Sequence, residues 1–104
     1  MSDIVDDFNS YRSKMNDKIL NEKSKVLNRI FNLDSNAFKP GALDRKTKEL
    51  LGLVASTVLR CDDCVQYHLE QCHKENISKT EVMESLEIAT LVGGTVIPNL
   101  RRAF

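Results

Sequence analysis

Two cysteines and a histidine stand close together in the middle of this chain, at a spacing that redox chemistry can use. They are Cys61, Cys64 and His68, in the segment CDDCVQYH. Residues three or four positions apart lie on one face of a helix, so in a helix the three side chains form one stripe. The two thiols are then close enough for a disulfide with modest local adjustment. Helical side chains lean toward the N-terminus, so the imidazole is aimed at the Cys64 sulfur.

The start of a helix favours the thiolate form of this pair. Unpaired backbone N–H groups there stabilise negative charge on Cys61 or Cys64, and the imidazole of His68 can take up the Cys64 proton. Either effect can lower a thiol pKa from about 8.5 toward neutrality. Asp62 and Asp63 act in the opposite direction because they add negative charge close by, although both can point to solvent.

A zinc site is the main alternative use of these side chains, and helix geometry disfavours it. Cys72 continues the stripe, but at about 1.5 Å of rise per residue it lies roughly 16 Å from Cys61 along the axis. One zinc ion, with bonds of about 2.0–2.3 Å, cannot use the whole stripe. Cys61, Cys64 and His68 alone would bind it only with distortion, and a site shared between subunits stays open. We therefore predict no metal and no organic cofactor.

The neighbouring Cys72 and His73 are not expected to take part in the chemistry. Cys72 lies one turn beyond His68 and is predicted to be a buried structural thiol rather than a resolving cysteine. His73 lies off the stripe and is predicted to face solvent. The remaining alternative for Cys61 and Cys64 is a chance C-x-x-C in which both thiols are small core residues.

The apolar pattern is helical nearly throughout, which predicts an all-α fold of about five to six helices, with the C-x-x-C at the start of one of them. The expected helical segments are residues 4–15, 21–33, 44–59, 61–76 and 79–92, of which the first two are either one bent helix or two. Gly93-Gly94 is expected to end the last segment, and Pro98 bars its simple continuation. Val96-Ile97 is a candidate for a short extended piece.

Local signals mark several of these helix boundaries. Asp44 is predicted to cap the third helix, and Ser78 with Glu81 forms a capping box that opens the fifth. A loop is predicted over residues 34–36 (Asp-Ser-Asn) and 39–41 (Lys-Pro-Gly), because both triplets are rich in turn-forming residues.

Composition and charge limit the class of protein. The chain has 104 residues, with 15 basic and 15 acidic side chains and a formal net charge of zero, so we expect one domain over residues 1–104 and no binding of nucleic acid.

The longest mostly apolar run, residues 50–59, is about half of the roughly 20 residues that span a bilayer, so no membrane association is expected. The acidic start lacks the pattern of a secretory signal, and three cysteines without such a signal favour a reducing compartment. We therefore expect a cytoplasmic protein.

Several of these residues together resemble the carboxymuconolactone decarboxylase superfamily, most closely its alkylhydroperoxidase D (AhpD) branch. The resemblance covers about residues 43–98 and rests on the segment LDRKTKEL at 43–50, on Cys61-x-x-Cys64-x-x-x-His68, and on Gly93-Gly94 and Pro98. The combination of glutamate, C-x-x-C and histidine at these separations is specific, whereas C-x-x-C alone is not.

The resemblance implies an all-α fold and a thiol-dependent peroxidase or disulfide reductase. It implies that Cys64 is the peroxidatic thiol, that Cys61 is the resolving thiol and proton donor, and that Glu49 and His68 relay protons. It also implies a homo-oligomer, a trimer or a hexamer, whose substrate is a hydroperoxide or a disulfide and whose reductant is a thiol or another protein. The best-known peroxidase members carry a histidine where this chain has Asp63, so the proton relay is shorter here.

Glu49 is one of 15 acidic residues, and the resemblance is what singles it out. It lies on the helix before the cysteine helix, so an antiparallel hairpin can bring it within about a turn of His68. A glutamate buried there needs a partner, and a histidine is a suitable one.

Two other functions stay open. One is a lactone decarboxylase-like lyase with His68 as its base, which is disfavoured because the true lactone decarboxylases are not marked by this C-x-x-C pair. The other is an interaction module in which the disulfide switches helix packing without turnover.

Overall fold

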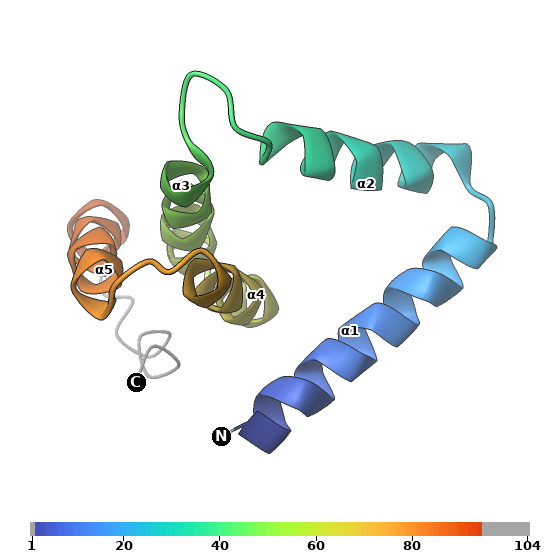
Figure 1. The fold of residues 1–104 in the computed structure, drawn as a ribbon, viewed down its shortest axis with the longest axis horizontal. Coiled ribbons are helices and arrows are strands. Elements are labelled where there is room, and N and C mark those ends of the chain that lie inside the picture. The colour runs from blue at the N-terminus through green and yellow to red at the C-terminus, as the bar shows by residue number, and fades with distance from the viewer. Residues whose placement is uncertain (1, 95–104) are drawn as a thin grey trace. The chain divides into compact units, whose positions relative to one another are not determined.

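All the regular structure that the computed structural model describes, over residues 2–94, is α-helical (Figure 1). The five helices are α1 (Ser2–Asn21), α2 (Lys25–Ala37), α3 (Arg45–Val58), α4 (Asp62–Lys74) and α5 (Lys79–Gly93). The predicted all-α fold is confirmed, and so is the position of the C-x-x-C at the start of one helix, α4. The predictions for Val96-Ile97 and Pro98 lie outside the described residues.

The chain divides into two compact units, Met1–Ala37 and Phe38–Phe104. The first unit contains α1 and α2, and the second contains α3, α4 and α5. The prediction of one domain over residues 1–104 stays a prediction. None of the described helices is both long enough and apolar enough to cross a membrane.

In the first unit, α1 and α2 are separate helices, which answers a question that the sequence left open. Lys23 between them has a φ of 57°, a left-handed conformation that interrupts a helix. The Ser24 hydroxyl accepts a hydrogen bond from the Leu27 backbone N–H at 3.2 Å and caps the new helix. No residue of α2 is buried. Its exposed large apolar side chains are Val26, Leu27, Ile30 and Leu33.

The loop predicted over residues 34–36 is wrong, because these residues continue α2 to Ala37. Their side chains are exposed, and aspartate, serine and asparagine each cost a helix only up to about 0.7 kcal/mol. The next strong helix breaker is Pro40, which restricts itself and the residue before it but nothing further back. The loop predicted over residues 39–41 is confirmed, since they lie between α2 and α3.

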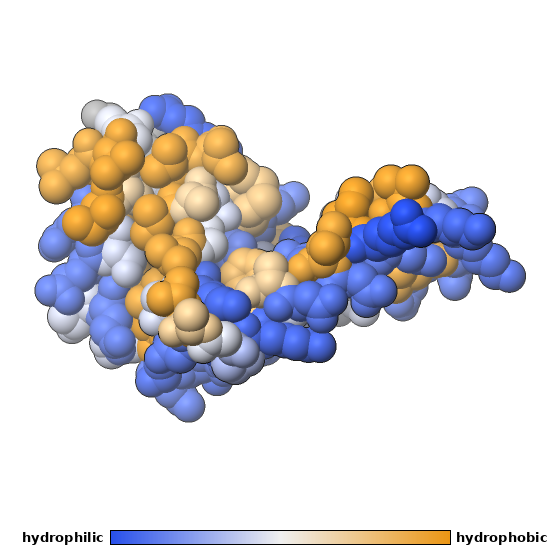
Figure 2. All heavy atoms as spheres, turned by 90° about the horizontal axis from the view of Figure 1, so that it is seen from above, coloured by the Kyte–Doolittle hydropathy of each residue, from blue (hydrophilic) through white to orange (hydrophobic). Residues whose placement is uncertain are grey.

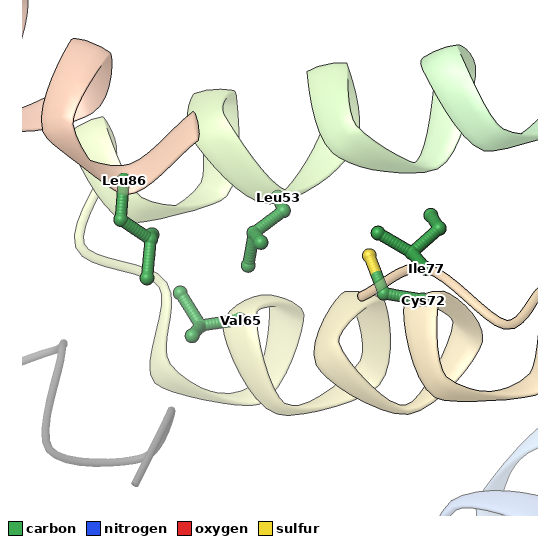
Figure 3. Close-up of a cluster of buried hydrophobic side chains, with 5 residues drawn as sticks. All are labelled: Leu53, Val65, Cys72, Ile77 and Leu86. Atoms are coloured by element: carbon green, nitrogen blue, oxygen red, sulfur yellow. The ribbon is translucent and has the colours of Figure 1, made fainter. Parts of the chain in front are cut away.

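The second unit packs both α4 and α5 against α3. Figure 3 shows α3 and α4 running side by side, with the Leu53 side chain between them. The apolar core draws on all three helices and on the turn after α4. Its buried members are Leu53, Val65, Cys72, Ile77 and Leu86.

Local hydrogen bonds fix where α3 and α5 begin, as predicted. Asp44 Oδ1 accepts from the Thr47 N–H at 2.8 Å, and hydrogen bonds from Thr47 lower the pKa of the Asp44 carboxyl. Ser78 and Glu81 form the reciprocal capping box at the start of α5, with bonds of 2.9 and 3.1 Å. Gly94, with a φ of 77°, follows the last residue of α5, so the predicted end of that helix is confirmed.

The turn between α3 and α4 is a Schellman motif, in which two backbone bonds close the end of a helix around a left-handed residue. Arg60 is that residue, with a φ of 59°, and its N–H donates to the Thr57 carbonyl at 3.0 Å. The Cys61 N–H donates to the Ser56 carbonyl at 3.1 Å. The tight turn reverses the chain, so α3 and α4 form an antiparallel hairpin in which Cys61 begins the return.

Candidate active site

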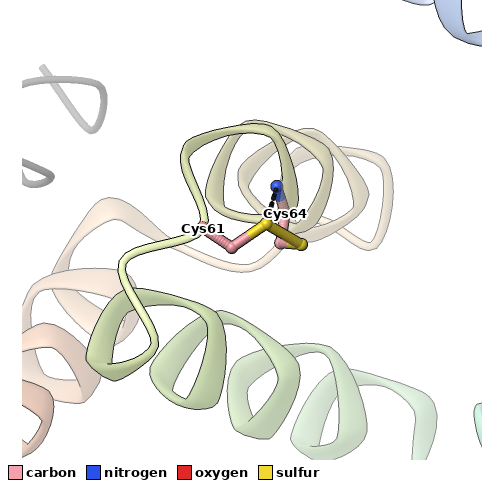
Figure 4. Close-up of a disulfide and its surroundings, with 2 residues drawn as sticks. All are labelled: Cys61 and Cys64. Carbon is pink, nitrogen blue, oxygen red and sulfur yellow. Dashed lines mark hydrogen bonds between the residues drawn. A yellow bond between two sulfur atoms is a disulfide. The ribbon is translucent and has the colours of Figure 1, made fainter.

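Cys61 and Cys64 form a disulfide at the start of α4, with their Cα atoms 5.2 Å apart (Figure 4). Cys61 is the N-cap of the helix, and its sulfur accepts a hydrogen bond from the Cys64 backbone N–H at 3.3 Å. The predicted proximity of the two thiols is therefore confirmed. Asp62 and Asp63 follow in the first turn with exposed side chains. A sulfur that caps a helix lies where unpaired N–H groups favour negative charge.

Glu49 on α3 and His68 on α4 are in direct contact. The carboxylate oxygen Oε2 lies 3.2 Å from the imidazole Nδ1. The Glu49 side chain is only 1% exposed and that of His68 is 12% exposed. The expected proximity of Glu49 to His68 across the hairpin is thus present, while their catalytic roles stay a prediction. The carboxylate faces Nδ1, so the other ring nitrogen, Nε2, is left for chemistry.

The second oxygen of Glu49 faces a cation. Arg45 Nε lies 3.5 Å from Glu49 Oε1, one turn earlier on α3, and 3.9 Å from an oxygen of Glu75 at the end of α4. The buried carboxylate is therefore placed between a guanidinium and an imidazole. The sequence-based prediction did not include Arg45, although its position four residues before Glu49 puts both on one face of the helix.

Gly52 gives the imidazole of His68 its place against α3. A Cβ atom at residue 52 would lie 2.6 Å from His68 Cε1 and 2.9 Å from Nδ1, closer than real Cβ contacts. The ring therefore occupies the space that any larger residue would fill. The sequence-based prediction also missed Gly52. Two signals were available. A glycine inside a helix costs about 0.5–1 kcal/mol of stability relative to alanine, and Gly52 lies three residues after Glu49, on the same face of the helix.

Two aromatic rings flank the imidazole of His68. The Tyr67 ring meets it edge to face, with centroids 5.1 Å apart, and the Phe38 ring is tilted at 5.5 Å. Together with Gly52 and Glu49, these rings restrict the orientation of the imidazole. His68 itself lies four residues after Cys64 on α4. That its ring points at the Cys64 sulfur stays a prediction.

Cys72 is a buried thiol of the core, as predicted. It is 1% exposed and belongs to the apolar cluster with Leu53 and Val65. Burial, and secondarily the negative charge of Glu49, raises the pKa of the Cys72 thiol to about 12. A thiol with so high a pKa is not a nucleophile at neutral pH. His73 is exposed, also as predicted.

Within residues 2–94, no three histidine, cysteine, aspartate or glutamate side chains are arranged so that they could hold one metal ion.

A sequence model of the carboxymuconolactone decarboxylase family matches residues 24–104. The chain belongs to this family. The match includes the disulfide, the Glu49–His68 pair and the three helices that carry them. The predicted relationship is therefore confirmed, and it extends further toward the N-terminus than the resemblance over residues 43–98.

Two curated relatives match over shorter stretches. The chain is 31% identical over 62 residues to the alkyl hydroperoxide reductase AhpD of Corynebacterium kroppenstedtii, which is 60% of this chain and 36% of that protein. It is 30% identical over 57 residues to uncharacterized protein 4 in the cox locus of Paracoccus denitrificans, which is 55% of this chain and 51% of that protein. The chain thus spans between about a third and a half of the length of these relatives.

Solved structures of two family members have the same fold. TM1620 of Thermotoga maritima is 55% identical, with a TM-score of 0.89 over 93% of this chain and 86% of that one. An involvement of TM1620 in the antioxidative response has been suggested. The apo form of lpg0406 from Legionella pneumophila, a carboxymuconolactone decarboxylase family protein, is 25% identical, with a TM-score of 0.87 over 97% of this chain and 91% of that one.

Replacing Gly52 by alanine tests whether the imidazole depends on the missing side chain. An ordinary Gly→Ala change inside a helix stabilises by about 0.5–1 kcal/mol. In Gly52→Ala the new methyl group must displace the His68 ring, so we expect the Glu49–His68 hydrogen bond to break and no gain in stability. The imidazole ¹⁵N resonances of His68 and unfolding in urea measure the two effects.

Gly41→Ala is the matched control, because a Cβ at residue 41 would meet only Lys48 Nζ, at an ordinary 3.6 Å. This variant should leave the His68 resonances unchanged. Unchanged resonances in Gly52→Ala, together with a normal gain in stability, would contradict the assigned role of Gly52.

The raised pKa of Cys72 predicts a specific loss of stability at alkaline pH. The neutral thiol favours the folded state fully below the thiol pKa of the unfolded chain, about 8.5, and this contribution is lost as the pH rises toward about 12. Between pH 7 and 10 the loss should be about 2 kcal/mol. Urea unfolding of the reduced protein across this range measures it.

Cys72→Ala supplies the comparison, because it lacks the thiol and should lose correspondingly less stability over the same pH range. The cavity in this variant lowers stability at every pH and does not change the slope. Parallel pH curves for the two proteins would show that ionisation of Cys72 is not linked to folding.

Proposed function

We propose that this chain is a thiol-dependent oxidoreductase, an alkylhydroperoxidase-like peroxidase or a disulfide reductase, with Cys61 and Cys64 as its redox dithiol. The observation that carries this proposal is the disulfide at the start of α4, on the same helix as an imidazole held by a buried carboxylate. Membership of the family, and the AhpD among the relatives, support the same chemistry.

In the peroxidase cycle the Cys64 thiolate attacks the terminal oxygen of a hydroperoxide. The O–O bond breaks, the sulfur supplies two electrons, and the departing alkoxide takes up a proton to become an alcohol. Cys64 is left as a sulfenic acid. The Cys61 thiol then attacks the Cys64 sulfur, so that the disulfide forms and the sulfenic hydroxyl leaves with a proton as water. An external dithiol or a reduced protein returns two electrons and two protons.

As a disulfide reductase the same pair would act by thiol–disulfide exchange. A thiolate of the pair attacks one sulfur of the substrate disulfide, the substrate S–S bond breaks, and its other sulfur leaves as a thiolate that takes up a proton. The second cysteine then attacks the mixed disulfide, which forms the Cys61–Cys64 bond and releases the remaining substrate sulfur as a thiol. In either case His68 accepts the proton of the attacking thiol and Glu49 holds the imidazole. Asp63, exposed in the first turn of α4, stands where the best-known peroxidases have a second histidine.

We also infer that the chain acts as a homo-oligomer, a trimer or a hexamer. Large apolar side chains are exposed on the second unit, among them Leu59 at 78%, Leu91 at 82% and Val92 at 78%. Figure 2 shows apolar side chains gathered on one face of the second unit. Exposed clusters of this kind are typical of association surfaces.

Light scattering at micromolar concentration should give a mass well above the 11.8 kDa of one chain, whereas a monomer would contradict the inference.

The decisive experiment follows consumption of a hydroperoxide with a dithiol reductant. The wild-type protein should turn over many equivalents, whereas Cys61→Ser and Cys64→Ser should each fall to the background rate. Cys72→Ala is the control and should keep the activity, because this thiol is buried away from the disulfide pair. In Cys61→Ser, a sulfenic-acid reagent should label Cys64.

Other results would separate the alternatives. A single stoichiometric oxidation by peroxide, with no reduction of a disulfide substrate such as insulin, would support the redox switch. Label only at Cys72 would mean that the reactive thiol is misassigned. Activity on a lactone that survives replacement of both Cys61 and Cys64 by serine would favour a lyase with His68 as its base.

A further inference from the structure

The two oxygens of the Glu49 carboxylate have different partners. Oε2 faces His68 Nδ1 at 3.2 Å, and Oε1 faces Arg45 Nε at 3.5 Å. A carboxylate that is 1% exposed has almost no water to stabilise its charge. A guanidinium remains positive at every physiological pH. Arg45 therefore supplies a permanent counter-charge to the Glu49 carboxylate.

Arg45 is itself held at the open end of the α3–α4 hairpin. It is the first residue of α3, and the same Nε lies 3.9 Å from Glu75 Oε1, just after the last residue of α4. The Nε atom is buried and makes no hydrogen bond with the described residues. Its interaction with both carboxylates is thus electrostatic, and it links the first residue of α3 to the residue that follows α4.

We propose that Arg45 is a positioning residue of the redox site, which keeps Glu49 as a carboxylate with Oε2 turned toward His68. This inference rests on the function proposed above and adds a direction to its proton path. A carboxylate can only accept at Nδ1, so His68 carries its resting proton there and presents Nε2 as the base. The Cys64 proton moves to Nε2, and the resulting imidazolium donates it to the departing alkoxide.

In this arrangement Glu49 orients the imidazole and stabilises its positive form but does not take the proton. The three groups have the same roles as in a carboxylate–histidine–nucleophile triad, in which the carboxylate stays ionised throughout. A relay in which Glu49 itself becomes protonated would place a neutral carboxyl group beside the Arg45 guanidinium. This is less favourable than an ionised carboxylate there, because a nearby positive charge stabilises the charged form of the carboxyl.

An ordinary surface ion pair does not explain Arg45 equally well. Exposed pairs at this helical spacing contribute little to the stability of a protein, and their loss has little consequence. Here one partner is buried, and removing the cation leaves a carboxylate without its counter-charge inside the protein. The charge of Glu49 is also felt at Cys72, where it is the second cause of the raised pKa. Among the described residues, Arg45, His68 and Cys72 interact with Glu49, and Glu75 interacts with it through Arg45.

Arg45→Met in the full-length reduced protein tests the proposal without any turnover assay. We expect the ¹⁵N spectrum of His68 to change from the tautomer protonated at Nδ1 in the wild type to a mixture. We also expect alkylation of Cys64 by iodoacetamide at pH 7, followed by peptide mass spectrometry, to slow about tenfold or more. Lys46→Met removes the same charge from an exposed position on the same helix and should change neither readout.

Two further variants distinguish positioning from a structural effect. Arg45→Lys keeps the charge and should restore most of the Cys64 alkylation rate. In a Glu49→Gln background, Arg45→Met should produce no additional slowing, because the amide has no charge to hold. If Arg45→Met does not fold, Glu75→Gln replaces it, since it loosens Arg45 while leaving its charge, and should slow alkylation about twofold to threefold.

An unchanged His68 tautomer in Arg45→Met, or in Glu75→Gln where that replaces it, would overturn the proposal. So would equal slowing by Arg45→Met in the wild-type and Glu49→Gln backgrounds. A wild-type protein that shows the expected couplings but consumes no hydroperoxide and reduces no disulfide would instead refute the proposed function and leave the role of Arg45 standing.

Discussion

Burial of the Glu49 carboxylate is the constraint on which the arrangement of the candidate site depends. A charge that is 1% exposed must be neutralised by neighbours, because the interior offers no water to do so. Its partners come from both helices of the hairpin, a guanidinium from the start of α3 and an imidazole from the middle of α4. The two helices must therefore lie in one register, and Gly52 must leave the space that the imidazole fills.

The turn of the hairpin connects this pair to the dithiol. Cys61 completes the hydrogen bonds that end α3 and is also the residue that caps α4. The first sulfur is thus fixed by the same turn that sets the register of Glu49 against His68. Cys64 then follows one turn into α4 and His68 one turn later, so helix geometry relates all three side chains. A shift of one helix against the other would disturb the buried pair and leave the disulfide intact.

Sequence alone predicted the parts that depend on local interactions. The starts of α3 and α5 and the dithiol at the start of α4 follow from contacts between residues three or four apart. The extent of α2 was misjudged because polar residues that favour turns are also tolerated on an exposed helix. Gly52 and Arg45 were missed for a different reason. Gly52 matters because of its contact with His68 on α4, and no pattern within α3 specifies which residue of α4 faces it. Arg45 faces Glu49 within α3, but this contact gains importance only because Glu49 is buried, which depends on the packing of α3 in the folded unit.

The environment of His68 is a consequence of this packing. His73 is exposed, and Asp63 occupies the place between the cysteines where the best-known peroxidases have a histidine. Under the proposed function, His68 therefore has to serve as the base without a second imidazole close to Cys64. A single base is effective only if its tautomer and orientation are fixed beforehand. Glu49, Gly52 and the two flanking rings restrict the imidazole from several sides. The tight environment of His68 is thus what a site with one histidine requires.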